Sequence, residues 1–296
     1  MDDLQEAKSL VLNTNSVLDI ANPGESAKAL FPFVASDYLW RGMHPFHEAT
    51  GVEAVADLFW DPLKVAMGTL QRRPDIFFAG RNEIDNFNSV WVVEMGHLMG
   101  IWNSSWIGIS PSKKLSFLRY CEFHRVENNK ITETANYVDI LNLADQTGRL
   151  PISCTTGLSV LIPGPRDHDG LKYQASSESE SLATLKLIST MVKDLRRAEI
   201  ASPKQHMEHF WNSDMTWFGP GGIGVSGFFE GYRLGHSGPF EDGLEYVGHT
   251  EHVARLGEGN FGGFFGYPSL TMKSNGFLGL PSSNSPADMR IVCLLY

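Results

Sequence analysis

Residues 121–148 read CEFHRVENNKITETANYVDILNLADQTG, and this stretch carries the clearest indication of the fold. Residues 127–130, Glu-Asn-Asn-Lys, give a turn signal between two segments rich in β-branched and aromatic residues. We therefore expect a hairpin of two strands, over 115–126 and 131–139, followed by a short helical segment over 140–145.

The sequence before this hairpin has the pattern of helix and then of strand. Apolar residues within 52–59 have the spacing of one helix face, and residues 76–79 and 89–96 have the composition of strands. Helices followed by hairpin-connected strands predict an α+β fold, in which a curved antiparallel sheet wraps around N-terminal helices. The interior of such a cone is a natural ligand pocket.

The chain also contains an internal repeat. Four pairs of short segments match in the same order at nearly constant separation, which indicates a duplicated domain. The matched pairs are 37–40 with 214–217, 51–54 with 227–230, 95–100 with 261–266, and 106–112 with 277–283. We therefore expect two tandem cone-shaped domains of the same α+β fold.

A segment rich in Pro, Gly, Ser and charge separates the two copies. We place a first domain at 1–148, a linker at 149–181 and a second domain at 182–296. In this alignment Arg125 corresponds to Tyr296, so the last hairpin of the second domain is missing, and the counterpart of Asp139 would lie near position 310. Because a missing strand would leave an unpaired sheet edge, we expect that the sequence is clipped.

Composition disfavours several classes of partner. The 296 residues include 24 Lys+Arg and 34 Asp+Glu, a net charge of −10, and no basic run, so we expect no nucleic acid or membrane partner. Cys121, Cys154 and Cys293 form no C-x-x-C pair, which predicts neither a metal site nor a disulfide framework. The opening MDDLQEAKSL is acidic and no long apolar run occurs, so we expect no signal peptide and a cytoplasmic protein.

Two stretches of the sequence resemble the SnoaL-like polyketide cyclases, a branch of the nuclear-transport-factor-2-like (NTF2-like) fold. They are 121–148 and 209–240, the second reading HFWNSDMTWFGPGGIGVSGFFEGYRLGHSGPF. The family pattern has a strand, a dGkI turn, a Trp, an Asp four residues later and an L-x-x-Q-x-G close. Here Asp139 and Leu143-x-x-Gln146-x-Gly148 match, while Ala135 takes the place of the Trp.

The resemblance implies ring closure by intramolecular aldol addition, without metal or cofactor. A carboxyl in an apolar pocket serves as base and then as acid when burial raises its pKa. Asp139 is the first candidate, carried over from the terminal aspartate of the family. Its alternative role is that of the N-cap of the helix over 140–145, because Asp is a preferred capping residue.

Three histidines are further catalytic candidates. His97 lies on the predicted strand within 94–100, where it could point into the cone as an acid or orienting group, or serve as a satisfied core histidine. His44 lies in a loop that we place at the pocket mouth. In the second copy His236 and His249 are the candidates for the role of His97.

Aromatic and basic residues provide candidates for ligand binding. Trp40 and Trp217 occupy the same repeat position, so both are candidate pocket walls, although core packing suits most tryptophans. Arg119 and Arg290 also recur, and an inward Arg could bind a carboxylate or an ester carbonyl, whereas an outward one would be solvated surface. The candidate ligand-binding residues are Trp40, Trp60, Trp102, Arg119, Trp217, Tyr232, His249 and Arg290.

These features give one leading function and two alternatives. The leading one is a polyketide (ester) cyclase, or a related cofactor-free isomerase or hydrolase, acting on a small apolar carbonyl compound. The alternatives are a non-catalytic protein that binds a hydrophobic small molecule in the same pocket, and an interaction module with an open sheet face. The fused pair of domains suggests an intramolecular pseudo-dimer or a homodimer.

Overall fold

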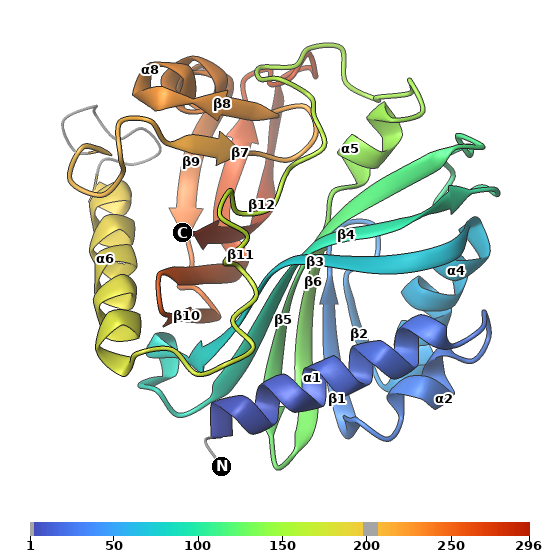
Figure 1. Ribbon diagram of the computed structural model, residues 1–296. Helices are drawn as coiled ribbons and strands as arrows, with labels where there is room; N and C mark the ends of the chain where they lie inside the picture. The colour runs from blue at the N-terminus through green and yellow to red at the C-terminus, as the bar shows by residue number, and fades with distance from the viewer. Residues whose placement is uncertain (1–2, 198–206) are drawn as a thin grey trace.

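The computed structural model describes residues 3–197 and 207–296 (Figure 1). The first half consists of α1 (Asp3–Ile20), α2 (Ser26–Leu30), β1 (Val34–Gly42), β2 (Glu48–Thr50), α3 (Val52–Val55), the π-helical turn η1 (Ala56–Trp60), α4 (Asp61–Ala66), β3 (Met67–Arg81), the 3-10 turn η2 (Glu83–Asp85), β4 (Val90–Trp102), β5 (Leu115–Glu127), β6 (Lys130–Val138) and α5 (Ile140–Asp145). We call this unit the first cone.

The strands of the first cone form one six-stranded sheet in the order β2-β1-β6-β5-β4-β3. Neighbouring strands are antiparallel except β1 and β6, which are parallel, because the long excursion through helices and strands between them brings the chain back in the same direction. Figure 1 shows α1 lying across one face of this sheet, with α1 contacting β3 and β4. Ala7, Val11 and Leu18 have helical spacing and bury the inner side of α1.

The second half repeats this order of elements. It consists of α6 (Glu178–Arg197), β7 (Thr216–Phe218), β8 (Val225–Gly227), α8 (Phe228–Tyr232), the π-helical turn η3 (Arg233–Ser237), α9 (Gly238–Gly243), β9 (Leu244–His249), β10 (Ala254–Glu258), β11 (Phe261–Ser274) and β12 (Ser283–Leu295). We call this unit the second cone. Strands β10, β11 and β12 form a sheet in which β9 also pairs with β11, while β7 and β8 form a separate two-stranded sheet.

The repeat is visible in the hydrogen-bonded register. Residues Leu39 and Thr50 pair in the first cone as Thr216 and Gly227 pair in the second, so one constant offset in sequence relates both members of the pair. The same offset relates the first residues of the turns η1 and η3. The expected fold class, two tandem α+β units with curved sheets beside N-terminal helices, is therefore confirmed.

One of the matched segments has a different register from the expected one. Val93 pairs with Phe123, and Phe265 pairs with Val292, and all four side chains face the contact between the two sheets. Val93 thus corresponds to Phe265, whereas the match of 95–100 with 261–266 would set it against Gly259. That match was wrong, because glycines and aromatic residues fit one another at several registers and only pairing and burial select one.

The two sheets pack on each other through their outer faces. The apolar residues there, which we call the interface cluster, are Ile76, Phe78, Trp91, Val93, Met95, Cys121, Phe123, Ala135 and Tyr137 of the first cone and Ala254, Leu256, Phe261 and Phe265 of the second. Residues 149–177 connect the cones and form no helix or strand, apart from isolated bridges at Leu158 and Leu171. Helix α6 begins at Glu178, inside the predicted linker, and the domain boundaries stay a prediction.

Among the described residues, no helix combines the length and the apolar character that a membrane crossing requires.

Candidate active site

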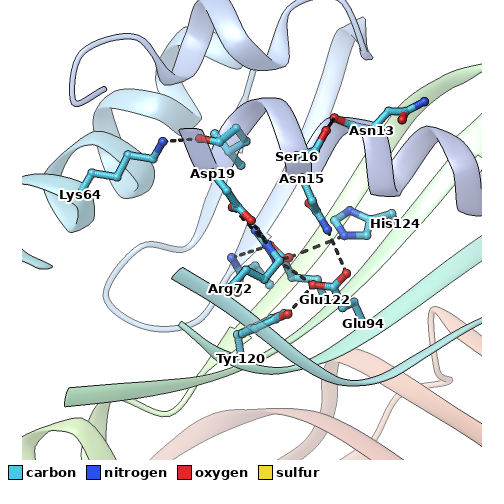
Figure 2. Close-up of polar contacts among 12 residues, drawn as sticks. Asn13, Asn15, Ser16, Asp19, Lys64, Arg72, Glu94, Tyr120, Glu122 and His124 are labelled. Carbon is cyan, nitrogen blue, oxygen red and sulfur yellow. Dashed lines mark hydrogen bonds and ion pairs between the residues drawn. The ribbon is translucent and has the colours of Figure 1, made fainter. Parts of the chain in front are cut away.

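The inner face of the first sheet carries a group of polar side chains, buried except for the half-buried Asp19, which we call the Arg72 cluster (Figure 2). They come from α1, β3, β4, β5 and β6, and on β5 they occupy every second position, as residues on one face of a strand do. The members are Asn15, Asp19, Arg72, Glu94, Tyr120, Glu122, His124, Thr134 and Asn136.

Arg72 lies at the centre of the cluster and connects two glutamates. Its Nη1 donates to Glu94 Oε1 at 3.1 Å and to Glu122 Oε2 at 2.8 Å, and its Nε donates to both carboxylate oxygens of Asp19 at 3.3 Å. Burial opposes the charge of the guanidinium, but Glu122 and Glu94 outweigh burial and raise the pKa of Arg72 well above its ordinary value. Arg72 is therefore a fixed cation inside the cone.

The two glutamates differ in their surroundings. Glu94 is held by three side-chain donors, since it also accepts from Asn15 Nδ2 at 2.9 Å and from the hydroxyl of Tyr120. Glu122 accepts from Arg72 and, at 3.1 Å, from Asn136 Nδ2. Burial raises the pKa of Glu122, against the opposing effect of Arg72, so Glu122 is the carboxyl of this pair that is suited to carry a proton.

Polar atoms without a partner gather around Glu122. Among the described residues, Arg72 Nη2, His124 Nε2 and Asn136 Oδ1 are buried and make no hydrogen bond. His124 Nδ1 contacts Thr134 Oγ1 at 2.9 Å, but its Nε2 is 3.7 Å from Glu122 Oε2, beyond hydrogen-bond length. Burial lowers the pKa of His124 to about 4, so its ring is neutral at pH 7. Three such atoms around one carboxyl are suited to a polar group of a ligand.

Sequence reasoning missed the charged members of this cluster. Arg72, Glu94 and Glu122 lie far apart in the chain, and in the sequence each has the character of an ordinary solvated surface residue. The available signal is their position within strands, because Glu94 interrupts an apolar run and Glu122 and His124 alternate with Cys121 and Phe123. Charged residues at every second position of a strand, with apolar residues between them, indicate a buried polar site.

Asp139 lies outside the Arg72 cluster, at the start of α5. Its Oδ1 accepts from the backbone N–H of Asn142 at 2.9 Å, which makes it the N-cap that was the alternative role. Both carboxylate oxygens also accept from the N–H of Gly221 in the second cone, at 3.1 and 2.9 Å. Burial raises the pKa of Asp139, although these N–H groups act in the opposite direction. A catalytic role for Asp139 stays a prediction.

His97 and Arg119 face away from the interior of the first cone. His97 on β4 pairs with Arg119 on β5, and Met95 pairs with Cys121 two residues along the same strands. His97 and Arg119 therefore lie on the face of the sheet that carries the interface cluster. Of the two alternatives for His97, the one in which it points into the cone was therefore wrong, and the side chain is buried outside the cone interior. Both faces of this sheet are covered, so burial along β4 does not alternate.

Both residues have partners near the contact between the cones. His97 Nδ1 is 3.4 Å from Asp75 Oδ2, and Arg119 Nη1 donates to the carbonyls of Phe218 (3.4 Å) and Gly219 (3.5 Å) of the second cone. Burial lowers the pKa of Arg119, against the opposing effect of Asp139. The structure thus brings Asp139, His97 and Arg119 into one neighbourhood, outside the cone interior.

Three other candidates lie outside the cone interiors. His44 is exposed, with its ring edge-on to His47. Arg290 donates to the carbonyl of Gly42 at 3.0 Å, contacts His47 Nδ1 at 3.0 Å and lies over the ring of Tyr267. His249 is exposed and contacts the hydroxyl of Tyr246 at 2.5 Å.

The three tryptophans of the first cone that were candidate ligand-binding residues belong to its core. Trp40, Trp60 and Trp102 are 1%, 4% and 0% exposed. Trp40 packs on Phe59, and Trp102 donates to the carbonyl of Ser104. Trp60 also lies beside the Arg72 cluster, since the guanidinium of Arg72 is 5.4 Å from the centre of its ring.

The second cone brings three predicted residues together. The ring of His236 stacks on Trp217 with a centroid distance of 4.0 Å and lies 5.0 Å from Tyr232 and 4.4 Å from Phe240. Burial lowers the pKa of His236 to about 4, and its Nδ1 has no hydrogen-bond partner among the described residues. This group is aromatic and uncharged, unlike the Arg72 cluster.

The comparisons with known proteins concern the fold. No protein-family model matches this sequence, and no curated protein matches it. Similar solved structures include a candidate SnoaL-like polyketide cyclase from Jannaschia sp. CCS1, with 13% identity, 50% of this chain and 94% of that chain covered, and a TM-score of 0.38. The chain is similar in fold to SnoaL-like and NTF2-like proteins.

Two further structures have comparable similarity. An NTF2-like protein from Burkholderia xenovorans LB400 is 20% identical, with 49% of this chain and 97% of that chain covered and a TM-score of 0.35. An LEH-like epoxide hydrolase from M. tuberculosis is 15% identical, with 50% of this chain and 93% of that chain covered and a TM-score of 0.34. Each SnoaL-like or NTF2-like structure thus matches about half of this chain, and the likeness concerns the fold alone.

The polar cluster is present in one of the two cones. Glu94 pairs with Glu122 in the first cone as Gly266 pairs with Ile291 in the second, and the next inward residue of β5, His124, corresponds to Cys293. The difference in residue number that relates β1–β2 to β7–β8 also places Val192 of α6 at the position of Asn15 of α1. An apolar residue therefore replaces the amide as well. At these three described positions the second cone therefore has apolar side chains in place of the carboxyl, imidazole and amide of the Arg72 cluster.

No group of three or more His, Cys, Asp or Glu within 3–197 and 207–296 is placed to hold a metal ion.

Proposed function

We propose that the first cone is an acid–base site for a small apolar carbonyl compound, such as a polyketide ester, and that it catalyses isomerisation or intramolecular aldol ring closure. The observation that carries the proposal is the set of partnerless buried atoms around Glu122, a carboxyl whose pKa burial raises. A carboxyl whose pKa is raised toward neutrality can both accept and return a proton.

Four members of the cluster have a direct role in this chemistry. Glu122 removes the proton alpha to the carbonyl, and the free Nη2 of Arg72 donates to the oxygen that becomes the enolate. Glu94 and Asp19 hold the guanidinium in place. The enolate carbon then attacks the second carbonyl, and protonated Glu122 returns its proton to the new alkoxide, so the product is an isomer of the substrate.

A turnover assay with product mass tests this proposal. Wild type, Glu122→Gln and Asp139→Asn are incubated with polyketide esters and small hydrophobic ketones. Ring closure conserves mass and changes retention, whereas hydrolysis adds the mass of water. We expect Glu122→Gln to lose roughly a hundred- to ten-thousand-fold in kcat, the usual contribution of one general base. Asp139→Asn should keep most of the turnover.

The opposite result would reject the site. If a folded Glu122→Gln enzyme keeps its turnover while Asp139→Asn loses it, the chemistry takes place at Asp139 and the Arg72 cluster is structural. Circular dichroism and thermal unfolding of both variants show whether each is folded.

A binding protein is the second candidate function. The observation that favours it is that the interior of the first cone is shielded from solvent. Glu94, Tyr120 and Glu122 are only 1%, 1% and 2% exposed. A receptor predicts ligand affinity that changes in Glu122→Gln and no product from any compound in the panel.

The assembly proposed with this function is an intramolecular pseudo-dimer of the two cones. The packing of their outer sheet faces through the interface cluster supports it, as do backbone carbonyls of each cone that accept from an arginine of the other.

A further inference from the structure

A line of three buried polar side chains leads from β1 to Glu122. The hydroxyl of Tyr38 hydrogen-bonds to the side chain of Thr134, and Thr134 Oγ1 contacts Nδ1 of His124 at 2.9 Å. Nε2 of His124 then lies 3.7 Å from Glu122 Oε2, without a hydrogen-bond partner within the described residues. Tyr38 and Thr134 are thus linked to the proposed base through one histidine.

The pairing of the strands brings these side chains together. Tyr38 and Trp40 lie on one face of β1, and Trp40 pairs with Thr134 on β6. At the other edge of β6, Thr134 pairs with His124 of β5. Because residues two apart in a strand share a face, the three polar side chains all lie on the inner side of the sheet.

The protons available in this line decide which nitrogen of His124 carries one. Burial raises the pKa of Tyr38, so its hydroxyl keeps a proton that needs an acceptor. When Thr134 Oγ1 accepts from Tyr38, the proton of Thr134 is free to be donated to Nδ1 of His124. In the reverse arrangement His124 donates to Thr134, Thr134 donates to the oxygen of Tyr38, and the proton of Tyr38 loses this acceptor. An unmade hydrogen bond at a buried donor shifts such an equilibrium about tenfold.

Glu122 favours the same tautomer of His124. The ring is neutral at pH 7, so one ring nitrogen carries a proton and the other a lone pair. A lone pair on Nε2 would face the carboxylate oxygen of Glu122 and be repelled, whereas Nε2–H is attracted to that oxygen. Both ends of the line therefore place the proton on Nε2.

We propose that His124 is a second hydrogen-bond donor of the first cone, and that Tyr38 and Thr134 are positioning residues that hold its proton on Nε2. Arg72 Nη1 and His124 Nε2 lie beside the same oxygen of Glu122, at 2.8 and 3.7 Å. In the proposed ring closure, Arg72 holds the enolate oxygen and His124 Nε2–H donates to the carbonyl that is attacked. His124 keeps its proton, and Glu122 still returns one to the new alkoxide. The donor role rests on the proposed function, whereas the tautomer does not.

Nuclear magnetic resonance of the ring nitrogens tests the tautomer without a substrate. The intact protein is isotope-labelled at its histidine nitrogens and measured at pH 7, and His124→Phe identifies the signals of His124 by their loss. We expect the proton on Nε2 in more than about 90% of wild-type molecules, and in about half of the Tyr38→Phe molecules. Thr134→Ser keeps the hydroxyl and should retain the wild-type tautomer. Tyr137→Phe is the matched control, because this buried tyrosine donates to the carbonyl of Gly266 instead.

A proton on Nδ1 of His124 in wild type would overturn the inference, and this spectrum decides the tautomer even if a variant does not fold. An unchanged tautomer in folded Tyr38→Phe would also overturn it. Turnover is the second readout. His124→Phe should lose about a hundred- to a thousandfold in kcat, as enzymes do without one oxyanion donor, and Tyr38→Phe about twofold, in proportion to its Nε2–H fraction.

The two readouts separate this inference from the proposed function. If a folded His124→Phe enzyme keeps its turnover while Glu122→Gln loses it, the donor role of His124 is rejected and the proposed site stands. If neither variant changes turnover, the proposed function is rejected and the donor role with it, whereas the spectra still decide whether Tyr38 and Thr134 hold the tautomer.

Discussion

The carboxylate of Asp139 accepts backbone N–H groups from two places in the chain, the nearby Asn142 of its own helix and the distant Gly221 of the second cone. Such donors satisfy a buried carboxyl without any reacting partner. Glu122 is in the opposite situation, because its neighbours Arg72, His124 and Asn136 each keep one polar atom unpaired. At the scale of single residues, the polar atoms around Asp139 are satisfied and those around Glu122 are not, and this difference is the reason for proposing Glu122 as the catalytic carboxyl.

A single histidine should make the protein sensitive to acid. His236 occupies the position in η3 that Phe59 holds in η1, and burial lowers its pKa from 6.5 to about 4. The unfolded chain therefore binds a proton that the native state does not, and stability falls as the pH drops from about 6.5 to 4. Between pH 8 and pH 5 this group costs about 2 kcal/mol, at about 1.36 kcal/mol for each pH unit.

We predict that His236→Phe loses about 2 kcal/mol less stability than wild type between pH 8 and pH 5. Urea unfolding at the two pH values measures the difference. His124, whose pKa is also about 4, remains in the variant, so part of the acid sensitivity should persist. His209→Gln, at an exposed histidine, is the control, and it should follow wild type. Equal losses in His236→Phe and wild type would mean that His236 does not cause the effect.

At the scale of elements, the strands show which parts of this fold can be predicted. The hairpin expected over 115–126 and 131–139 was found as Leu115–Glu127 and Lys130–Val138, because its turn residues and β-branched segments are local features. The direction of side chains on β4 was not predictable. Since helices cover one face of the sheet and the second cone covers the other, nine of the first ten residues of β4 are buried and no alternation can be read.

The candidate site was harder to predict than the fold. The pattern located Asp139, but it could not show that Arg72, Glu94 and Glu122 meet, because they come from three strands. Their meeting depends on strand register, which the irregularity of β3 between Pro74 and Ile76 shifts by one residue. Only the paired sheet places these charges together.

Gly96 permits that irregularity of β3. A Cβ built on Gly96 would overlap the carbonyl oxygen of Arg73 and lie 2.8 Å from Cα of Pro74. We predict that Gly96→Ala destabilises the protein by about 1–3 kcal/mol, since the backbone of β3 must shift. Gly248→Ala in β9 is the matched control, because no atom lies within 4 Å of its added Cβ. Urea unfolding of both should separate them, and equal stabilities would show that the bulge adapts freely.

At the scale of the whole molecule, the contacts between the cones are reciprocal. Arg119 of the first cone donates to the carbonyl of Gly219, and Arg290 of the second donates to the carbonyl of Gly42. Gly42 and Gly219 hold the same place in the repeat, because the register of β1–β2 matches that of β7–β8. Two-fold interfaces repeat each contact in this way, which supports the proposed pseudo-dimer.

A buried ion pair joins the two cones and gives a test of their coupling. Lys8 Nζ contacts Glu258 Oε1 at 2.5 Å, both side chains are almost fully buried, and Glu258 Oε2 also accepts from the N–H of Ala79. Removing one partner leaves a buried unpaired charge. We predict that Lys8→Met and Glu258→Gln each cost about 3–5 kcal/mol in urea unfolding.

The double variant should cost clearly less than the two single losses together, because it leaves no unpaired charge. Additive losses would contradict a direct interaction between Lys8 and Glu258. If unfolding instead occurs in two steps, one for each cone, the cones are not one cooperative unit and the proposed pseudo-dimer would be rejected.

Because the segment 149–177 joins the two cones in one chain, the contact between them can have a lower affinity than a contact between separate subunits. A short covalent connection between two modules gives them an effective concentration in the millimolar range. An interface with a Kd of about 10 µM would then be closed in about 99% of molecules, although two separate chains of the same affinity would come apart on dilution. Neither cone therefore needs the tight binding of a free subunit, and one of them can change its interior without losing the other.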